Sequence, residues 1–294
     1  MNYLTLLKFD HIKKTFYVPS FETSAGGKII ADYKNKKRSF VEDQNIKYKA
    51  MPEGPPIVLM KEDLQKFAGK KVLEIKGSSI TETSEIKGHV LREIKTHGKQ
   101  TFLIFDKENI RIHLLMFGSY SLVEKKDQAH NLRLGLEFKS GGMYFYTCNV
   151  KPVDPEFISG LDWEADVMSD AWNPEKAEKK LKANPKMMVC DALMDQDIFA
   201  GVGNIIKNEA LFRVGIHPET LIGHLPPAKL KAMIDESRNY SFDFKKWKKE
   251  NVLRKRFQVY HEKNCPKCGE EIIKKETGTT KRTSFFCKKD QKLY

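Results

Sequence analysis

The stretch of sequence that decides the fold is MPEGP, residues 51–55, because the character of the chain changes there. Residues 1–50 show no periodic pattern long enough to predict a core, whereas a helix is predicted immediately afterwards, at residues 57–67. The pentapeptide also contains a proline, Pro52, whose reactivity depends on its position in the chain. A prolyl nitrogen inside a chain is a tertiary amide whose lone pair is delocalised, so Pro52 can act as a nucleophile only when nothing precedes it.

Short alternating segments separated by turn residues follow this helix, and so many of them in succession predict an antiparallel sandwich. The predicted strands are residues 71–75, 89–96, 101–105, 110–115, 119–123, 132–138 and 143–147. Beyond residue 155 the apolar spacing becomes helical, with helices predicted at residues 174–183, 187–193, 205–212, 226–239 and 241–252. The tail from Cys265 has the pattern of a compact Cys-rich hairpin.

The 294-residue chain carries a net charge of +13, which favours a polyanionic partner, although many soluble proteins are basic without binding one. No apolar run approaches the roughly 18 residues of a spanning helix, and the N-terminus lacks an apolar signal-peptide core. We therefore expect no membrane association. Five cysteines, three of them near the C-terminus, favour a metal site in a reducing, cytoplasmic compartment over a disulfide framework.

A glycine-rich turn within DQDIFAGVGNIIKNEALF, residues 195–212, leads into one of the predicted helices. Gly203 and Asn204 would present backbone N–H groups and a side-chain amide at the positive end of the helix dipole, an arrangement suited to a phosphate. An ordinary tight turn with Asn204 as the N-cap is the alternative explanation of the same pattern.

Three cysteines near the C-terminus, Cys265, Cys268 and Cys287, have the spacing of a metal-binding hairpin. A Cys-x-x-Cys pair followed by a later Cys suits tetrahedral Zn²⁺. A redox Cys-x-x-Cys is the alternative, but no strand–helix context of the thioredoxin type surrounds it.

These motifs, in this order, resemble the formamidopyrimidine-DNA glycosylase/endonuclease VIII (Fpg/Nei) family of DNA-repair enzymes, and the resemblance runs from residue 51 to residue 291. It implies an α+β multidomain fold with an antiparallel β-sandwich catalytic domain at residues 52–155. A helix–two-turn–helix DNA-binding domain would follow at 165–255, and a zinc-finger β-hairpin at 260–294. Residues 1–50 would then be an extension outside the working enzyme, with Met51 as the initiator.

The resemblance implies a catalytic role for four residues. Pro52, exposed by removal of Met51, would attack the sugar C1′ as a secondary amine and form a Schiff base, with Glu53 as the general acid/base. Lys99, in a predicted turn, and Arg282, at the hairpin tip, would stabilise phosphate charge. Without the resemblance, a turn lysine such as Lys99 would simply be solvated.

DNA contacts and the metal site are implied in the same way. Asn204 and Gly203 would hold phosphate beside the lesion, while Met116 and Phe117 would fill the gap left by an extruded base. Taken alone, that apolar pair looks like core. Asp290 stands where the family has a fourth zinc-binding Cys, so a Zn²⁺ site of three Cys and one Asp and a zinc-free hairpin both stay open.

The sequence thus predicts a monomeric, bifunctional DNA glycosylase/AP lyase that acts on double-stranded DNA of the bacterial nucleoid. It would remove oxidised bases and cut abasic sites by β,δ-elimination, and oxidised pyrimidines are favoured because the motifs lean towards endonuclease VIII. Pro56 replaces a second family Glu, which bears on rate and substrate range. The alternatives are a non-catalytic damaged-DNA-binding relative, with Pro52 blocked by the extension, and a zinc-ribbon adaptor without damage specificity.

Overall fold

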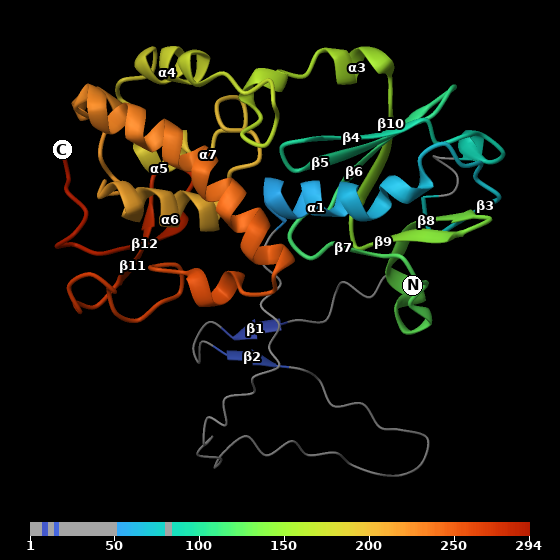
Figure 1. Ribbon diagram of the computed structural model, residues 1–294. Coiled ribbons are helices and arrows are strands. Elements are labelled where there is room, and N and C mark those ends of the chain that lie inside the picture. Colours follow the sequence, from blue (N-terminus) through green and yellow to red (C-terminus); the bar gives the residue numbers. More distant parts are fainter. Residues whose placement is uncertain (1–7, 11–14, 18–51, 80–83) are drawn as a thin grey trace, which may run out of the picture. The chain divides into compact units, whose positions relative to one another are not determined.

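The computed structural model describes residues 8–10, 15–17, 52–79 and 84–294 (Figure 1). The chain divides into two compact units, Met1–Tyr48 and Lys49–Tyr294. In the first unit, β1 (Lys8–Asp10) pairs with β2 (Thr15–Tyr17) in antiparallel register. Met51, the predicted initiator, lies outside the described residues. The elements and sites below all belong to the second unit.

Helix α1 (Gly54–Leu64) opens the second unit and passes into a 3-10 helix, Gln65–Phe67. It begins three residues before the predicted start at residue 57, because proline is tolerated in the first helical turn, where its missing N–H would be unpaired anyway. One face of α1 is fully buried in the sandwich core, and that face is formed by Ile57, Met60 and Leu64.

Two four-stranded antiparallel sheets form the predicted sandwich, which confirms that part of the expected fold. Their strand orders are β10-β6-β5-β4 and β3-β8-β9-β7, and side chains from both sheets and α1 make one core. The strands are β3 (Glu74–Lys76), β4 (Glu93–His97), β5 (Gln100–Ile104), β6 (Asn109–His113), β7 (Ser119–Ser121), β8 (Leu132–Phe138), β9 (Gly141–Tyr146) and β10 (Asn149–Val153).

A helical region follows the sandwich. Its helices are α3 (Pro155–Ser159), α4 (Pro174–Lys182), α5 (Val189–Ala192), α6 (Asn204–Val214) and α7 (Pro227–Lys249). Nine consecutive residues of α6, from Asn204 to Phe212, are buried, polar side chains included, so this helix lies inside the unit. None of the helices in the described part of the chain has both the length and the apolar character of a membrane span.

Two details of the sequence-based prediction are wrong. The helices expected at residues 226–239 and 241–252 are one continuous helix, α7, because the Ser241 hydroxyl donates to the Ser237 carbonyl at 2.7 Å and is satisfied without a helix break. Strand β10 is not predicted, because Pro152 disfavours a strand. It is tolerated because β10 is an edge strand, where one side of the ladder needs no donor.

The C-terminal hairpin pairs β11 (Ile273–Thr277) with β12 (Arg282–Phe286). It packs on α6 through a small core that consists of Phe212, Val259, Cys265, Ile272, Phe285 and Cys287. The hairpin is therefore held by the same buried helix that follows the glycine-rich turn.

Candidate active site and metal centre

Glu53 lies at the N-terminus of α6 and is only 1% exposed. Its Oε1 accepts a hydrogen bond from the Ile205 N–H at 2.8 Å, and its Oε2 accepts from the Gly203 and Ile206 N–H groups at 3.2 Å each. These N–H groups favour a negative charge, because the first N–H groups of a helix have no acceptor within it. A side chain 150 residues earlier in the sequence than Gly203 therefore caps α6.

This contact occupies backbone N–H groups of the phosphate site predicted at the glycine-rich turn, and the DNA contacts of Gly203 and Asn204 stay predictions. The backbone N–H groups assigned to a DNA phosphate already donate to a carboxylate of the protein itself. Gly203 is needed for another reason, because a Cβ at this position would overlap the carboxyl group of Glu53. Asn204 is 7% exposed and its Nδ2 donates to the Thr283 carbonyl at 3.0 Å, so its amide joins α6 to the hairpin.

Three glycines bring the separate parts of the site together. The Gly54 N–H donates to the Gly201 carbonyl at 2.8 Å. Gly201 has φ +97, and a Cβ on it would lie 3.3 Å from the Gly54 Cα and 3.5 Å from the Gly98 Cα. The start of α1, the β4–β5 turn and the loop before α6 thus meet backbone to backbone, which side chains at these positions would prevent.

Asp166 fixes the turn that carries Lys99. Its Oδ2 accepts from the Gly98 N–H at 2.9 Å, and its Oδ1 accepts from the Met168 N–H at 2.8 Å. Asp166 is 3% exposed, and burial raises the pKa of its carboxyl group. Sequence reasoning missed this residue, because a lone Asp in an irregular segment gives no signal of a partner 68 residues away.

Burial shifts the pKa values of Glu53 and Lys99 in opposite directions. Desolvation raises the pKa of Glu53, against the charge of Lys99 and the three N–H bonds. Desolvation lowers the pKa of Lys99, with the charge of Glu53 opposing that shift and the charge of Arg282 adding to it. Glu53, Lys99 and Arg282 therefore share one electrostatic environment, and Pro52 is the residue before Glu53. The raised pKa favours Glu53 as a proton donor.

Two further residues of α6 hold the strand that begins with Arg282. The Lys207 ammonium is fully buried and donates to the Ser284 hydroxyl at 2.9 Å, and burial lowers its pKa to about 8. The Asn208 Oδ1 accepts from the Phe285 N–H at 2.8 Å. Neither residue stood out in the sequence, where both look like ordinary polar positions of a helix.

The turn after β6 exposes apolar side chains. Gly118 N–H donates to the Leu114 carbonyl at 2.7 Å and closes the turn, and Leu115 adopts φ +55. As a result Leu115, Met116 and Phe117 are 51%, 45% and 61% exposed. The sequence alone suggested core for Met116 and Phe117, and the structure places them at the surface.

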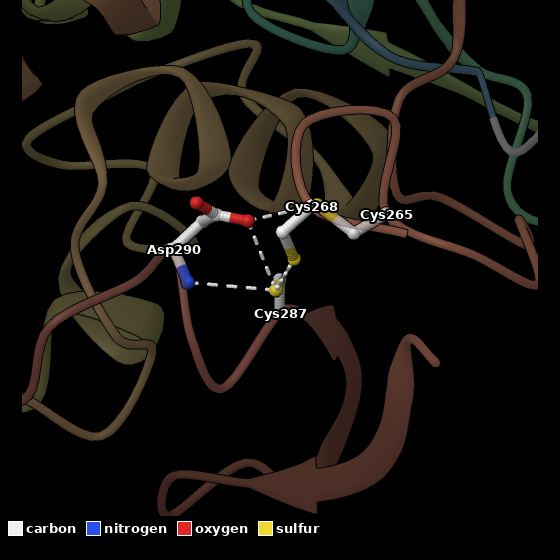
Figure 2. A group of neighbouring side chains, drawn as sticks. All are labelled: Cys265, Cys268, Cys287 and Asp290. Atoms are coloured by element: carbon white, nitrogen blue, oxygen red, sulfur yellow. Dashed lines mark hydrogen bonds between the residues drawn. The ribbon is translucent and has the colours of Figure 1, made fainter. Parts of the chain in front are cut away.

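Four potential metal ligands meet at the base of the hairpin (Figure 2). The ligand atoms of Cys265, Cys268, Cys287 and Asp290 all lie within 4.8 Å of one another. The Asp290 Oδ2 is 3.0 Å from the Cys265 Sγ and 3.3 Å from the Cys287 Sγ. In a tetrahedral site with bonds of about 2.3 Å, neighbouring ligand atoms lie about 3.8 Å apart. The cluster can therefore hold a metal ion, and the predicted Asp290 is one of its members.

Comparisons with known proteins agree with this architecture. The model of the Formamidopyrimidine-DNA glycosylase N-terminal domain matches residues 51–149, and that of the Formamidopyrimidine-DNA glycosylase H2TH domain matches residues 164–239. Endonuclease 8-like 3 of Xenopus laevis is 32% identical over 233 residues, which cover 75% of this chain and 38% of that protein. Formamidopyrimidine-DNA glycosylase of Photobacterium profundum is 28% identical over 240 residues, 72% of this chain and 86% of that protein.

Solved structures share the fold at low sequence identity. A viral DNA glycosylase gives a TM-score of 0.73 at 17% identity, covering 82% of this chain and 100% of that one. Formamidopyrimidine-DNA glycosylase of Lactococcus lactis, bound to DNA that contains an abasic site, gives a TM-score of 0.71 at 20% identity. The match covers 82% of this chain and 99% of that one.

The sandwich, the buried helix of the helix–two-turn–helix region and the Cys-rich hairpin define an Fpg-like fold. The chain belongs to the Fpg/Nei family and lies nearer its Nei side. It spans between 35% and 38% of the length of the Endonuclease 8-like 3 proteins that it matches.

Proposed function

We propose that this protein is a bifunctional DNA glycosylase/AP lyase whose nucleophile is the amine of Pro52, acting in a chain that begins at that residue. The observation that carries the proposal is the position of Glu53. It is a buried carboxyl group next to Pro52, held by three N–H groups at the start of α6. Its charge interacts with that of Lys99, which in turn interacts with the charge of Arg282. An acid whose pKa is raised, adjacent to a potential amine nucleophile, suits proton transfer to a leaving group.

The reaction begins when the Pro52 nitrogen attacks C1′ of the damaged nucleotide. The bond from C1′ to the base breaks and the base leaves with the electron pair. Glu53 protonates the ring oxygen, the sugar opens, and an iminium links Pro52 to C1′. Loss of a proton from C2′ then breaks the bond to the 3′ phosphate, and a second elimination releases the 5′ phosphate. Lys99 and Arg282 stabilise the phosphate charge in these steps.

The substrate we propose is double-stranded DNA with an oxidised base, pyrimidines favoured, or an abasic site. Residues 52–294 keep a net charge of +8, from 42 Lys and Arg against 34 Asp and Glu, and this charge supplies the salt-dependent grip on phosphates. Extrusion of the base leaves a gap in the stack, and the exposed Met116 and Phe117 are suited to fill it. A Lactococcus lactis protein of the same fold binds DNA that contains an abasic site. Oxidised pyrimidines are favoured because the chain lies nearer the Nei side of the family.

The metal we propose for the hairpin is one structural Zn²⁺, held by Cys265, Cys268, Cys287 and Asp290. A bound ion would fix the hairpin that carries Arg282 at the start of β12, so its contribution is to position and not to the chemical steps.

The alternative is a damaged-DNA-binding protein without lyase activity. It is favoured by the sequence as numbered, in which Met51 precedes Pro52 and leaves its nitrogen as an amide. Such a protein would keep Asn204, Arg282 and the exposed pair Met116 and Phe117 but form no covalent intermediate.

Borohydride trapping on a duplex with an abasic site separates the two. The test uses three chains: one that begins at Pro52, the full 294-residue chain, and a matched control with a single Gly before Pro52. We expect a covalent adduct from the first chain alone, with mass spectrometry placing it on the Pro52 nitrogen. Binding without an adduct from that chain would support the alternative, and an adduct on a lysine would overturn the assignment of Pro52.

A further inference from the structure

The turn at the tip of the C-terminal hairpin leads directly into Arg282. It consists of residues 278–281, between the last residue of β11 and the first residue of β12. Arg282 is the residue proposed above to stabilise phosphate charge during strand cleavage. A long side chain reaches a fixed point only when the backbone that carries it is fixed, so whatever holds this turn also sets the position of Arg282.

Asp191, on α5, holds the turn through its carboxylate. Its Oδ2 accepts a hydrogen bond from the Thr279 N–H at 2.8 Å, and its Oδ1 accepts from the Thr280 hydroxyl at 3.1 Å. The Thr280 N–H also donates to Oδ1, at the longer distance of 3.4 Å. Asp191 is only 9% exposed. Because hydrogen bonds to an ionised group are stronger than those between neutral groups, these contacts fix the turn firmly on α5.

The turn and the carboxylate also fit each other closely. Gly278 has φ +72, and a Cβ at this position would lie 2.3 Å from the Asp191 Oδ1. Any side chain at residue 278 would therefore displace either the carboxylate or the turn. The fit leaves the turn little room to move while Asp191 is in place.

The chain on the other side of Arg282 is held by α6. The Thr283 carbonyl accepts from the Asn204 Nδ2 at 3.0 Å and from the Lys207 ammonium at 3.3 Å. Arg282 thus lies between a turn that is bound to α5 and a strand that is bound to α6. The potential metal ligands do not replace the α5 contact, because Cys287 follows the opposite end of β12, at the base of the hairpin.

We propose that Asp191 is a positioning residue for Arg282. It holds the hairpin turn so that the guanidinium meets the phosphate of the reacting nucleotide, and it affects cleavage only through Arg282. The inference rests on the proposed function, since it takes Arg282 to stabilise phosphate charge. The alternative is that Asp191 stabilises the hairpin without setting the position of Arg282.

A double-mutant cycle in the chain that begins at Pro52 separates these two roles. Single-turnover cleavage of an abasic-site duplex is measured against protein concentration for the unsubstituted chain, Asp191→Ala, Arg282→Ala and the double variant. We expect Asp191→Ala to lower the maximal rate about 10- to 100-fold, since a misplacement of about 1 Å can cost a factor of about 10². In the Arg282→Ala background the same change should cost less than about twofold, because the guanidinium through which Asp191 acts is absent.

Two further readouts distinguish positioning from a general loss of stability. Asp191→Ala should divide its loss between the maximal rate and the half-saturating protein concentration in the same proportion as Arg282→Ala does. Asp191→Asn keeps an oxygen for the Thr279 N–H, so it should recover most of the lost rate.

Glu219→Ala is the matched control. Glu219 also joins the helical region to the hairpin, with both carboxylate oxygens 2.8 Å from the Lys275 Nζ, but this contact is to the middle of β11 and not to the turn. Because an exposed ion pair contributes little, Glu219→Ala should change the rate less than about twofold. Thermal unfolding shows that each variant is folded at the assay temperature. If Asp191→Ala does not fold, Gly278→Ala takes its place in the cycle, since its Cβ forces the turn and the carboxylate apart.

The positioning role is overturned when the loss of rate is as large in the Arg282→Ala background as in the unsubstituted chain, or when Asp191→Ala cleaves at the unsubstituted rate. Either result leaves the proposed function intact, because the unsubstituted chain still forms the borohydride adduct. Absence of that adduct from the unsubstituted chain would instead overturn the proposed function, and the role of Asp191 with it.

Discussion

Replacement of Glu53 by Gln keeps the size of the buried side chain and removes its ability to give and take a proton. Catalysis by a positioned acid or base contributes about 10²- to 10⁴-fold. We therefore expect Glu53→Gln to slow strand cleavage by that factor, which corresponds to about 3–5 kcal/mol of transition-state stabilisation.

The effect of Glu53→Gln on stability is expected to be small, because two terms oppose each other. The single oxygen of the amide can replace Oε2 and keep the Gly203 and Ile206 bonds, but the Ile205 N–H then faces an NH₂ group. A buried donor left unpaired costs about 1–3 kcal/mol. Against this, Gln carries no charge to desolvate, and desolvation is the largest influence on the Glu53 pKa. The net change should stay below about 2 kcal/mol.

The stability difference between the native protein and Glu53→Gln should depend on pH, and the direction of that dependence follows from the raised pKa of Glu53. Because the pKa of Glu53 is raised in the folded state, the folded protein binds this proton more tightly than the unfolded chain does. The contribution of Glu53 to stability is fully present below its ordinary pKa of 4.5 and is lost as the pH rises through the folded-state value. Gln has no such dependence, so the balance of stability should move in favour of Glu53→Gln as the pH rises from 4.5.

The assay combines single-turnover cleavage of an abasic-site duplex with urea unfolding at several pH values. Glu209→Gln is the matched control, since Glu209 is also buried and also accepts from backbone N–H groups, those of Gln258, Val259 and Tyr260. It should reproduce the pH-dependent stability with less than a tenfold loss of rate. The reasoning would be refuted by near-native cleavage from Glu53→Gln, or by a stability difference that does not vary with pH.

Two further variants test the place where Gly54, Gly98 and Gly201 meet and the metal cluster. In Gly201→Ala, the new Cβ meets the facing glycine backbones in a strained φ +97 conformation, so we expect a loss of about 1–3 kcal/mol in the free energy of unfolding. Gly141→Ala is the control, because Gly141 has φ +121 but open space around an added Cβ, so it should lose only the free energy that comes from backbone strain. Equal losses of unfolding free energy for the two variants, measured by urea unfolding, would contradict the packing argument. Asp290→Ala should weaken Zn²⁺ binding in a competition titration with a chromophoric chelator and lower the melting temperature of the zinc-loaded protein. Unchanged zinc affinity would remove Asp290 from the ligand set.

Most of the fold could be predicted from local patterns, and the exceptions have physical causes. Strand β8 has the predicted bounds, residues 132–138, because its alternation of apolar and polar residues is unambiguous. The two errors, α7 and β10, depend on context that a local pattern does not contain. In α7, the Ser241 hydroxyl is satisfied by the carbonyl of Ser237 one helical turn earlier. In β10, Pro152 is tolerated because the strand lies at the edge of its sheet.

The site was less predictable than the fold, because its residues are joined over long separations. The glycine-rich turn was correctly recognised as the start of a helix whose first N–H groups need an acceptor from outside the helix, but the sequence does not show which anion that acceptor is. A phosphate and the Glu53 carboxylate satisfy them equally well. Lys207 and Asn208 were missed for a related reason, since their partners are backbone and hydroxyl groups of a hairpin more than 70 residues away.

Because Glu53 caps α6, protonation of Glu53 is coupled to the contact between the sandwich and the helical region. Burial raises the pKa of Glu53 only while that contact is closed, so by linkage a proton on Glu53 stabilises the closed arrangement as much as closure stabilises the proton. Separation of the two regions would return the carboxyl group to water and leave the N–H groups of Gly203, Ile205 and Ile206 without their acceptor. The raised pKa of Glu53 therefore exists only while the sandwich and the helical region are in contact, and it returns to the ordinary value when they separate.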